Sequence, residues 1–311
     1  MDYLKRVKDT KVPEIDWDVD KVVSWTQFSN WQQCPHRWYL IWQKRFKTPP
    51  NIHFAFGTAM HETIQEYLEL MYNGSIRQAD EFDLHADFQE RILSEYKKDK
   101  EKLGEHFSTP EELTEFTNDG LEILDFFERW RQTYYYKTGW KLLGIEMPLL
   151  IAPSESNPHV KLYGKLDVVM WNKEQHRIKI QDLKTSTRGW NQWAKKDPGK
   201  KNQLVLYKSW FAKQYNVPND IVDVEYFILK RKVNPDAPYP AMRSRIQKFS
   251  PSSGKTTQNK LNKDLIRFVE ENFVGKEFKE KEHEKKPSDK TCKWCPFKDK
   301  PDLCDKKNKV G

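Results

Sequence analysis

Residues able to do chemistry are concentrated in the stretch 164–186, GKLDVVMWNKEQHRIKIQDLKTS. Two segments rich in valine and isoleucine flank the polar sequence NKEQH, which is typical of an antiparallel β-hairpin. If the turn is centred on 174–175, Asp167 lies opposite Asp182, and strand alternation places Lys184 on the same face as Asp182. The pattern therefore predicts two carboxylates and one ammonium within a small volume.

These charges suggest a metal site. Two carboxylates on a largely apolar hairpin repel each other unless a positive charge lies between them, and a divalent cation with oxygen ligands is the simplest such charge. Beside it, Lys184 could orient or deprotonate a water molecule, or stabilise the charge that develops on a phosphate during in-line attack. The D-x-K spacing therefore fits metal-dependent hydrolysis of phosphodiesters. The same tripeptide also fits an exposed strand end that carries an ion pair.

Three further polar residues have spacings that fit this chemistry. Gln203 and Tyr207 lie one helical turn apart in QLVLY, on one face of an expected helix. His61 ends FGTAMH, near the start of another expected helix, where a neutral imidazole could reach a metal ion. A lone histidine on an amphipathic helix also fits an ordinary surface or core position, so each of these residues is ambiguous by itself.

Four cysteines form a second constellation. Cys292, Cys295 and Cys304 follow a C-x2-C-x8-C pattern, whereas Cys34 lies far upstream in QQCPHRW. Two cysteines at x2 spacing can ligate one metal from a tight turn, and a third can close the site from beyond the following loop. The C-terminal segment is too polar to bury four unconnected thiols. Spacing alone fits Zn²⁺ or an iron–sulfur cluster, because four-cysteine sites hold both.

The elements that must position these residues change along the chain from helices to strands. Apolar periodicity and capping residues predict helices that start near Ser24 and Pro35 and helices over 56–72 and 108–136. Strands are expected over 140–152, 159–171, 177–185, 223–231 and 242–249, with helices over 202–215 and 257–273. This order predicts an α/β chain with a helical N-terminal half.

The composition is that of a soluble globular chain with a strongly ionised surface. Of 311 residues, 37% are hydrophobic and 32% charged, and no apolar run approaches the roughly 20 residues that span a bilayer. The net charge of +8 suits a polyanionic partner without requiring one. The first residues lack the apolar stretch of a signal peptide, so we expect a cytoplasmic location, in the host cytoplasm for a viral protein, and no membrane partner.

Taken in chain order, four short motifs resemble those of the PD-(D/E)xK nucleases. Within that superfamily they resemble the RecB-like branch, which includes the AddB nuclease domain and the CRISPR-associated RecB-like exonucleases. The motifs are G-x-x-x-H ending at His61, G-x-x-D ending at Asp167, D-x-K over 182–184 and Q-x-x-x-Y over 203–207. The resemblance extends over 24–304 and implies a restriction-endonuclease-like α/β core, with a central mixed β-sheet flanked by helices.

The resemblance implies a ligand set for Mg²⁺ or Mn²⁺. His61, Asp167 and Asp182 would bind the cation, and the backbone carbonyl of Leu183 would complete the protein ligands. Asp182 stands where many relatives have glutamate, a variation that the family tolerates. Glu146, in GIEMPL, stands where some relatives have an accessory acid; a structural salt bridge is the alternative.

The resemblance also implies the catalytic residues. Lys184 would be the catalytic lysine, while Gln203 and Tyr207 would position the substrate backbone or support that lysine. The full catalytic set would comprise Asp167, Asp182, Lys184, Gln203 and Tyr207.

For the cysteines, the RecB-like branch favours one of the two open alternatives. Its members carry one cysteine before the nuclease core and three after it, commonly followed by proline, and hold a [4Fe–4S] cluster with them. Proline follows both Cys34 and Cys295 here. The resemblance therefore favours a [4Fe–4S] cluster over structural Zn²⁺, as a clasp between the C-terminal segment and the N-terminal helices.

These features together predict one nuclease domain behind a short arm. Residues 1–23, with mixed charge and a proline, are expected to be a flexible arm. The domain would cover 24–311, with a helical part over 24–138, a nuclease core over 139–275, and a linker with the iron–sulfur clasp over 276–311.

A basic and aromatic segment follows the D-x-K motif, in TSTRGWNQWAKKDPGKKNQ. Alternating cations and tryptophans suit phosphate contacts and base stacking on DNA, and they equally suit a solvated loop that two tryptophans hold to the core. The candidate DNA contacts are Arg188, Trp190, Trp193, Lys195, Lys196, Lys200 and Lys201.

The favoured hypothesis is a metal-dependent deoxyribonuclease, an exonuclease that acts on DNA ends or single strands in repair or recombination. A restriction-type endonuclease and a non-catalytic DNA-binding recombination or repair partner are the alternatives. The set His61, Asp167, Asp182 and Lys184 favours an enzyme, because a binding module has little need for clustered acids and a lysine. No P-loop motif is present in the sequence, so a helicase motor would have to come from a partner chain.

Overall fold

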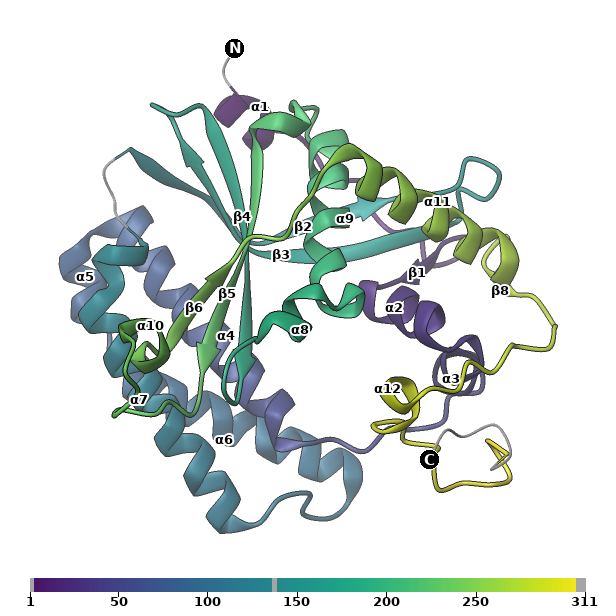
Figure 1. Ribbon diagram of the computed structural model, residues 1–311. Helices are drawn as coiled ribbons and strands as arrows, with labels where there is room; N and C mark the ends of the chain where they lie inside the picture. The colour runs from purple at the N-terminus through teal and green to yellow at the C-terminus, as the bar shows by residue number, and fades with distance from the viewer. Residues whose placement is uncertain (1–2, 136–138, 306–311) are drawn as a thin grey trace. The chain divides into compact units, whose positions relative to one another are not determined.

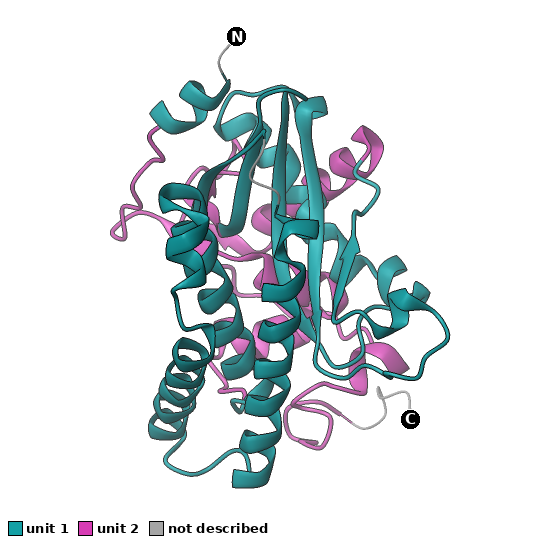
Figure 2. Cartoon of the chain, turned by 90° about the vertical axis from the view of Figure 1, so that its left-hand side faces the viewer, with its two compact units in different colours: residues 1–10, 49–147, 165–253 teal, residues 11–48, 148–164, 254–311 magenta. Residues whose placement is uncertain are grey.

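The chain divides into two compact units, each assembled from separate segments (Figure 2). Unit 1 comprises 1–10, 49–147 and 165–253, and unit 2 comprises 11–48, 148–164 and 254–311. The structure, a computed structural model, describes residues 3–135 and 139–305 (Figure 1). This division differs from the single domain predicted for 24–311, because sequence patterns give the order of elements and not the grouping of distant segments. Residues 306–311 of the expected clasp lie outside the described residues.

A mixed sheet in the order β1-β3-β4-β5-β6, with β2 also paired to β3, positions the hairpin (Figure 1). The strands are β1 (Lys21–Val23), β2 (Trp140–Ile151), β3 (Val160–Asn172), β4 (Arg177–Ser186), β5 (Val222–Lys230) and β6 (Ile246–Phe249). Strand β4 runs antiparallel to β3 and parallel to β5. Because β4 has a neighbour on both edges, most of its apolar residues are buried, and the predicted α/β fold with a central mixed sheet is confirmed.

Six helices of unit 1, α4 to α9, begin after a residue whose side chain caps the helix. The helices of unit 1 are α1 (Tyr3–Asp9), α4 (Ile52–Glu69), α5 (Ile76–Asp80), α6 (Leu84–Leu103), α7 (Pro110–Tyr134), α8 (Gln192–Lys196), α9 (Pro198–Gln214) and α10 (Pro240–Arg243), with the π-helical η2 (Leu70–Gly74) and the short η3 (Asn219–Ile221). Thr109 accepts a hydrogen bond from the N–H of Glu112, and Pro110 occupies the first turn of α7, as predicted.

One apolar core joins these helices to the strands of unit 1. Helix α4 packs against α6, α7 and β4, and α9 packs against β4 and β5. Phe56, Phe88, Phe127, Leu183 and Phe227 are all at most 1% exposed within this core. Such close packing fixes α4 and α9, the helices expected to carry His61, Gln203 and Tyr207, against the strand that carries the D-x-K motif.

Unit 2 has an aromatic core. Its helical segments are α2 (Trp25–Gln33), α3 (Pro35–Trp38), the π-helical η1 (Tyr39–Gln43), α11 (Lys255–Asn272) and α12 (Asp289–Cys292), and its small hairpin consists of β7 (Phe273–Val274) and β8 (Glu277–Phe278). Trp38 is fully buried and contacts Phe268, Phe273 and Phe278 edge to face. These contacts bring the N-terminal helices and α11 into one core.

Residues 3–23, the described part of the predicted flexible arm, include regular elements. They contain α1 and β1, and the ring of Tyr3 packs edge to face on Trp171. Arg6 donates to the carbonyl of Asn216 at 2.6 Å, and Lys21 pairs with Val160 in the sheet. Both elements are too short to show periodicity, so contacts with distant residues determine their structure.

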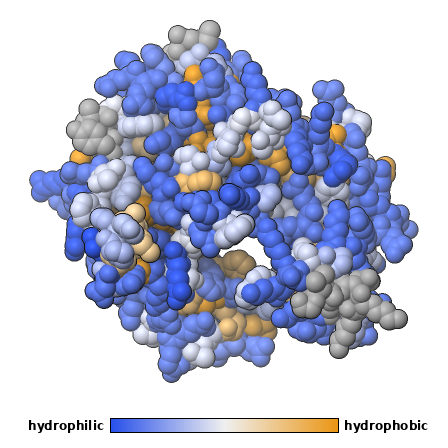
Figure 3. All heavy atoms as spheres, viewed as in Figure 1, coloured by the Kyte–Doolittle hydropathy of each residue, from blue (hydrophilic) through white to orange (hydrophobic). Residues whose placement is uncertain are grey.

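The face seen in Figure 3 is mainly hydrophilic, with small hydrophobic areas between the charged side chains. Within the ranges that the structure describes, no helix is both long and apolar enough to cross a membrane.

Candidate active site

The β3–β4 hairpin has the predicted register. Val168 pairs with Gln181, and the pairing continues to Asn172 and Arg177 beside the turn. One position beyond the first of these pairs, Asp167 faces Asp182. The turn is therefore centred on 174–175, and the two acids are brought together as the alternation of hydrophobic residues predicts.

The two acids and the lysine lie at short distances from one another and from α4. The carboxylate Oδ2 of Asp182 lies 2.5 Å from Nζ of Lys184. The backbone N–H of Leu183 donates to Oδ2 of Asp167 at 2.7 Å, and Nδ1 of His61 lies 3.8 Å from the same oxygen. Side-chain exposure is 5% for Asp182 and 32% for Lys184, so the lysine reaches from solvent toward a buried acid.

Burial sets the protonation states of this group. It raises the pKa of both Asp167 and Asp182 to about 6, although Lys184 opposes the shift. It lowers the pKa of His61 to about 4, and the charge of Lys184 adds to that effect. Burial also lowers the pKa of Lys184, but the charges of Asp182 and Asp167 raise it by more. At neutral pH the imidazole is therefore neutral and both acids are ionised, which are the forms that bind a metal.

Helix α4 approaches the hairpin closely at the glycine of the FGTAMH motif. A Cβ atom on Gly57 would lie 3.4 Å from Oγ1 of Thr185, so the absence of a side chain lets α4 lie close to the end of β4. His61 follows one turn later on the same helix. The glycine of this motif thus has a packing role that places His61 beside the hairpin.

Sequence reasoning missed Gln65, which lies one turn beyond His61 on α4. Its side-chain amide donates to Oε1 of Glu146 at 2.9 Å and to the backbone carbonyl of Asp167 at 3.1 Å. Gln65 is 5% exposed, so these bonds fix the strand position of Asp167 relative to α4. The spacing of four residues from His61 was the available signal.

Glu146 forms the salt bridge that the sequence offered as one alternative. Its Oε2 lies 3.2 Å from Nζ of Lys165, and its backbone φ is 51°, an uncommon value for a residue other than glycine. Its negative charge also contributes to raising the pKa of Asp167. Glu146 is therefore an ion-pair partner that acts electrostatically on the acid site.

Helix α9 carries the Q-x-x-x-Y pair into the same unit. Nε2 of Gln203 lies 3.4 Å from the hydroxyl of Tyr207, at the long end of the hydrogen-bond range. Burial raises the pKa of Tyr207 to about 12, so its hydroxyl stays protonated. Tyr226 on β5 accepts from the N–H of Leu204 and donates to the carbonyl of Lys200, which holds α9 on the sheet.

The basic segment before α9 contains two tryptophans in different environments. Trp190 is 6% exposed, and its ring packs on Tyr226 and Phe249. Its position differs from the stacking surface that the sequence suggested, because the ring belongs to the core. Trp193 is 81% exposed, with the ammonium of Lys196 6.0 Å from its ring centroid. Only Trp193 therefore offers a ring face to a ligand.

The four cysteines line one small pocket of about 30 Å³ in unit 2. Cys292 ends α12, and the N–H of Cys295 donates to its carbonyl at 3.0 Å, which is the predicted tight turn. Burial raises the pKa of Cys295, and the neighbouring Cys34 and Cys304 add to the shift. The pocket thus gathers cysteines from both ends of the chain, as the sequence predicted.

The acid site and the cysteine pocket both contain possible metal ligands, but their side chains are not arranged as a complete coordination shell in the described residues. Within the described ranges, 3–135 and 139–305, no group of three or more His, Cys, Asp or Glu side chains is arranged to hold a metal ion. In the acid site, Asp182 pairs with Lys184. The donor chemistry nevertheless fits, because two ionised carboxylates with a neutral imidazole suit Mg²⁺ or Mn²⁺, and four thiols suit iron–sulfur or zinc.

A family model identifies the superfamily of this chain. The family model of the PD-(D/E)XK nuclease superfamily matches residues 22–300, so the chain belongs to this superfamily. The chain is also similar to a solved structure named "Putative exonuclease" from Eubacterium rectale, with 11% sequence identity and a TM-score of 0.46, covering 94% of this chain and 89% of that one. A search of curated proteins finds no match.

Proposed function

We propose that this protein is a Mg²⁺- or Mn²⁺-dependent deoxyribonuclease that acts as an exonuclease on DNA ends or single strands. The observation that supports the proposal is the gathering of Asp167, Asp182 and Lys184 on one hairpin beside His61, in a chain of a nuclease superfamily. A protein that only bound DNA would have no use for two buried carboxylates whose pKa values are raised.

Each residue then has a role that its environment permits. His61, Asp167, Asp182 and the carbonyl of Leu183 would hold the cation, which would supply Lewis-acid stabilisation of the phosphate. Lys184, charged at neutral pH, orients the attacking water and stabilises the negative charge that develops on the phosphate. On α9, Gln203 and the protonated Tyr207 position the substrate backbone and support the lysine.

The basic segment 188–201 supplies the DNA contacts. Its cations are Arg188, Lys195, Lys196, Lys200 and Lys201. Trp193 stacks on a base, and Trp190 holds the segment to the sheet through its backbone N–H, which donates to Gln247 at 2.7 Å. Substituting Trp193 with alanine is expected to weaken single-stranded DNA binding about tenfold, measured by fluorescence anisotropy.

We propose further that the cysteine pocket would hold a structural [4Fe–4S] cluster, as in the RecB-like branch that the sequence resembles. The N-cap residue of α3, the last residue of α12 and two residues of the following turns are the cysteines that line the pocket, and all four are thiols. Protein purified without oxygen should contain about four iron and four sulfide per chain. Stoichiometric zinc in a colourless protein would contradict the cluster and leave the nuclease site untouched.

Cleavage assays test the activity itself. End-labelled linear and circular DNA, single- and double-stranded, is incubated with Mg²⁺, Mn²⁺ or EDTA. An exonuclease degrades linear DNA and spares circles, whereas cleavage of circles indicates an endonuclease. No cleavage under any condition supports a DNA-binding repair or recombination partner instead. Adding a helicase tests whether a motor from a partner chain extends degradation into duplex DNA.

A further inference from the structure

A second pocket, of about 380 Å³, lies in unit 2 and has the size of a small-ligand site. The turn before β1, β1 itself, η1 and the β7–β8 hairpin contribute to its walls. Three cations and three aromatic rings line it: Lys21, Arg45, Lys276, Trp17, Trp42 and Phe278. This combination is absent from the roles assigned above, which all belong to unit 1 or to the cysteine pocket.

Two of the cations are not neutralised by the protein. In the described part of the chain, no carboxylate lies within ion-pair distance of Lys21 or Arg45, and Lys276 donates to the backbone carbonyl of Asp18. The ammonium of Lys21 lies 4.4 Å from the ring centroid of Phe278. Burial lowers the pKa of Lys21, the nearby charges of Arg45 and Lys276 lower it further, and Glu277 opposes the shift in part.

Of the two acids in the wall, one is already paired. Asp20 is 6% exposed and binds the ammonium of Lys161, which lies outside the pocket lining. Glu277 therefore balances only part of the charge of three cations. A pocket with this excess favours an anionic group of more than one charge.

The backbone at Arg45 is in the left-handed region, with φ 61°. The N–H of Phe46 donates to the carbonyl of Leu40, so Arg45 occupies the position after η1 where glycine is favoured. An arginine at such a position is unfavourable for the fold, and uncommon backbone conformations of this kind concentrate at ligand sites. The residue type thus points to a binding role.

The aromatic rings of the pocket indicate which chemical group the anionic ligand carries besides its phosphate. Trp17 is 70% exposed beside the pocket, and the buried indole Nε1 of Trp42 has no hydrogen-bond partner in the described residues. A flat aromatic ring can stack on a nucleic-acid base, and a neighbouring cation can bind the phosphate of the same nucleotide. We infer that this pocket binds a nucleoside monophosphate, with its phosphate at Lys21 and Arg45 and its base at Trp17.

A free mononucleotide and the 5′-phosphorylated end of a DNA strand share this chemistry. The test uses the Lys184→Ala protein in EDTA, so that binding is measured without cleavage. Calorimetric titrations compare deoxyadenosine 5′-monophosphate, deoxyadenosine, inorganic phosphate, and one oligonucleotide with a 5′-phosphate or a 5′-hydroxyl. We expect the monophosphate to bind at least about tenfold more tightly than the nucleoside or phosphate. If only the 5′-phosphorylated oligonucleotide shows this preference, the ligand is the DNA end.

Variants assign the binding to this pocket. Arg45→Gly removes one cation and suits the backbone, so the variant should fold with an unchanged or higher Tm and bind about tenfold more weakly. Asn216→Gly, at φ 48° in unit 1, is the matched control and should bind normally. Trp17→Ala should weaken binding of the monophosphate and not of phosphate.

Two results would overturn the inference. The first is that neither the monophosphate nor the 5′-phosphorylated oligonucleotide binds more tightly than its unphosphorylated counterpart and inorganic phosphate. The second is that Arg45→Gly binds these ligands as tightly as Asn216→Gly. Failure of the nuclease proposal is seen separately, because wild-type cleavage is measured on DNA with metal, whereas this binding is measured without metal in an inactive protein.

Discussion

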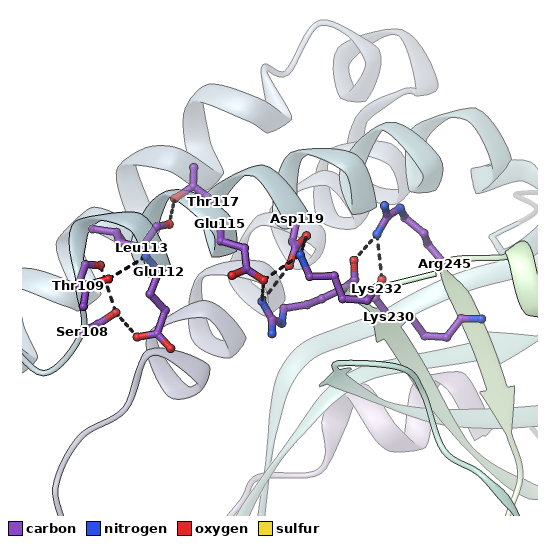
Figure 4. Close-up of polar contacts among 11 residues, drawn as sticks. Ser108, Thr109, Glu112, Leu113, Glu115, Thr117, Asp119, Lys230, Lys232 and Arg245 are labelled. Atoms are coloured by element: carbon purple, nitrogen blue, oxygen red, sulfur yellow. Dashed lines mark hydrogen bonds and ion pairs between the residues drawn. The ribbon is translucent and has the colours of Figure 1, made fainter. Parts of the chain in front are cut away.

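Unit 1 contains two buried ionic clusters that differ in how well their charges are matched. At the end of β5, Asp119 accepts from Arg231 at 2.8 Å and from Lys232 at 2.9 Å, so one carboxylate has two cations (Figure 4). At the acid site, Asp167 and Asp182 share one cation, Lys184, and burial raises the pKa of both acids. One cluster is complete within the protein, and the other needs a further positive charge.

The matched cluster connects helix to sheet. Helix α7 provides Asp119 and Glu115, and Arg231 and Lys232 follow β5. The guanidinium of Arg231 also lies 3.5 Å from the ring centroid of Phe116. Figure 4 shows Asp119, Glu115 and Lys232 directed toward one another between α7 and the strand ends. We assign this cluster to stability and the unmatched one to chemistry, and this contrast yields four predictions.

The largest effect is expected on activity. Lys184→Ala removes the cation that Asp167 and Asp182 share and should lower the rate of DNA cleavage about 1000-fold, because the charge on the phosphate loses its stabilisation. Lys232→Ala removes a cation from the matched cluster and should cleave at nearly the wild-type rate. Both are measured on linear single-stranded DNA with Mn²⁺. Equal activity of wild type and Lys184→Ala would refute the mechanism.

The second prediction concerns stability, for which the matched cluster should matter more than the acid site. Asp119→Ala removes the hydrogen-bonded carboxylate of Arg231, whose side chain is 7% exposed, and leaves it only Glu115 at 3.9 Å. The substitution should lower the free energy of unfolding by about 3 kcal/mol. Glu115→Ala removes a carboxylate that is 51% exposed from the same cations and should cost less than about 1 kcal/mol. Urea denaturation measures both. A loss from Glu115→Ala as large as that from Asp119→Ala would show that burial does not determine the cost.

The hairpin acids were predictable from sequence because strand alternation and a polar turn determine which residues face each other. Gln65 was not, since its bonds to Glu146 and to the carbonyl of Asp167 depend on how α4 meets the sheet. The same holds for Asp119 and Arg231, which are far apart in the chain and are joined by packing alone. Sequence periodicity predicts a helix or strand and which of its faces is buried. It does not predict which other element packs against that face.

The third prediction concerns the metal-free protein. The folded pKa of Asp182, about 6, exceeds the unfolded value of 3.8, so the folded state binds more protons between these values and loses stability as pH rises. Asp182→Asn removes this penalty and should raise the free energy of unfolding by about 3 kcal/mol at pH 8 in EDTA. The gain should shrink toward zero as pH falls to about 4.

Urea titrations of wild type and Asp182→Asn between pH 5 and 8 measure this difference. Asp236→Asn, at an exposed loop residue, is the control and should show no pH-dependent difference from wild type. A variant that is less stable than wild type at pH 8 would mean that Lys184 fully compensates Asp182. The acid site would then be a second matched cluster, contrary to the contrast drawn here.

The smallest effect tests whether Glu146 acts on the site through charge. The Lys165 and Glu146 side chains are 52% and 40% exposed, so Lys165→Ala should change the free energy of unfolding by less than about 1 kcal/mol. The unpaired Glu146 would, however, raise the pKa of Asp167 above about 6. Because Mn²⁺ binds the ionised acid, the pH below which affinity falls should move up by less than about one unit. Calorimetric Mn²⁺ titrations of wild type and Lys165→Ala from pH 5 to 8 measure this shift. A shift to lower pH would show that the charge of Glu146 does not control the pKa of Asp167.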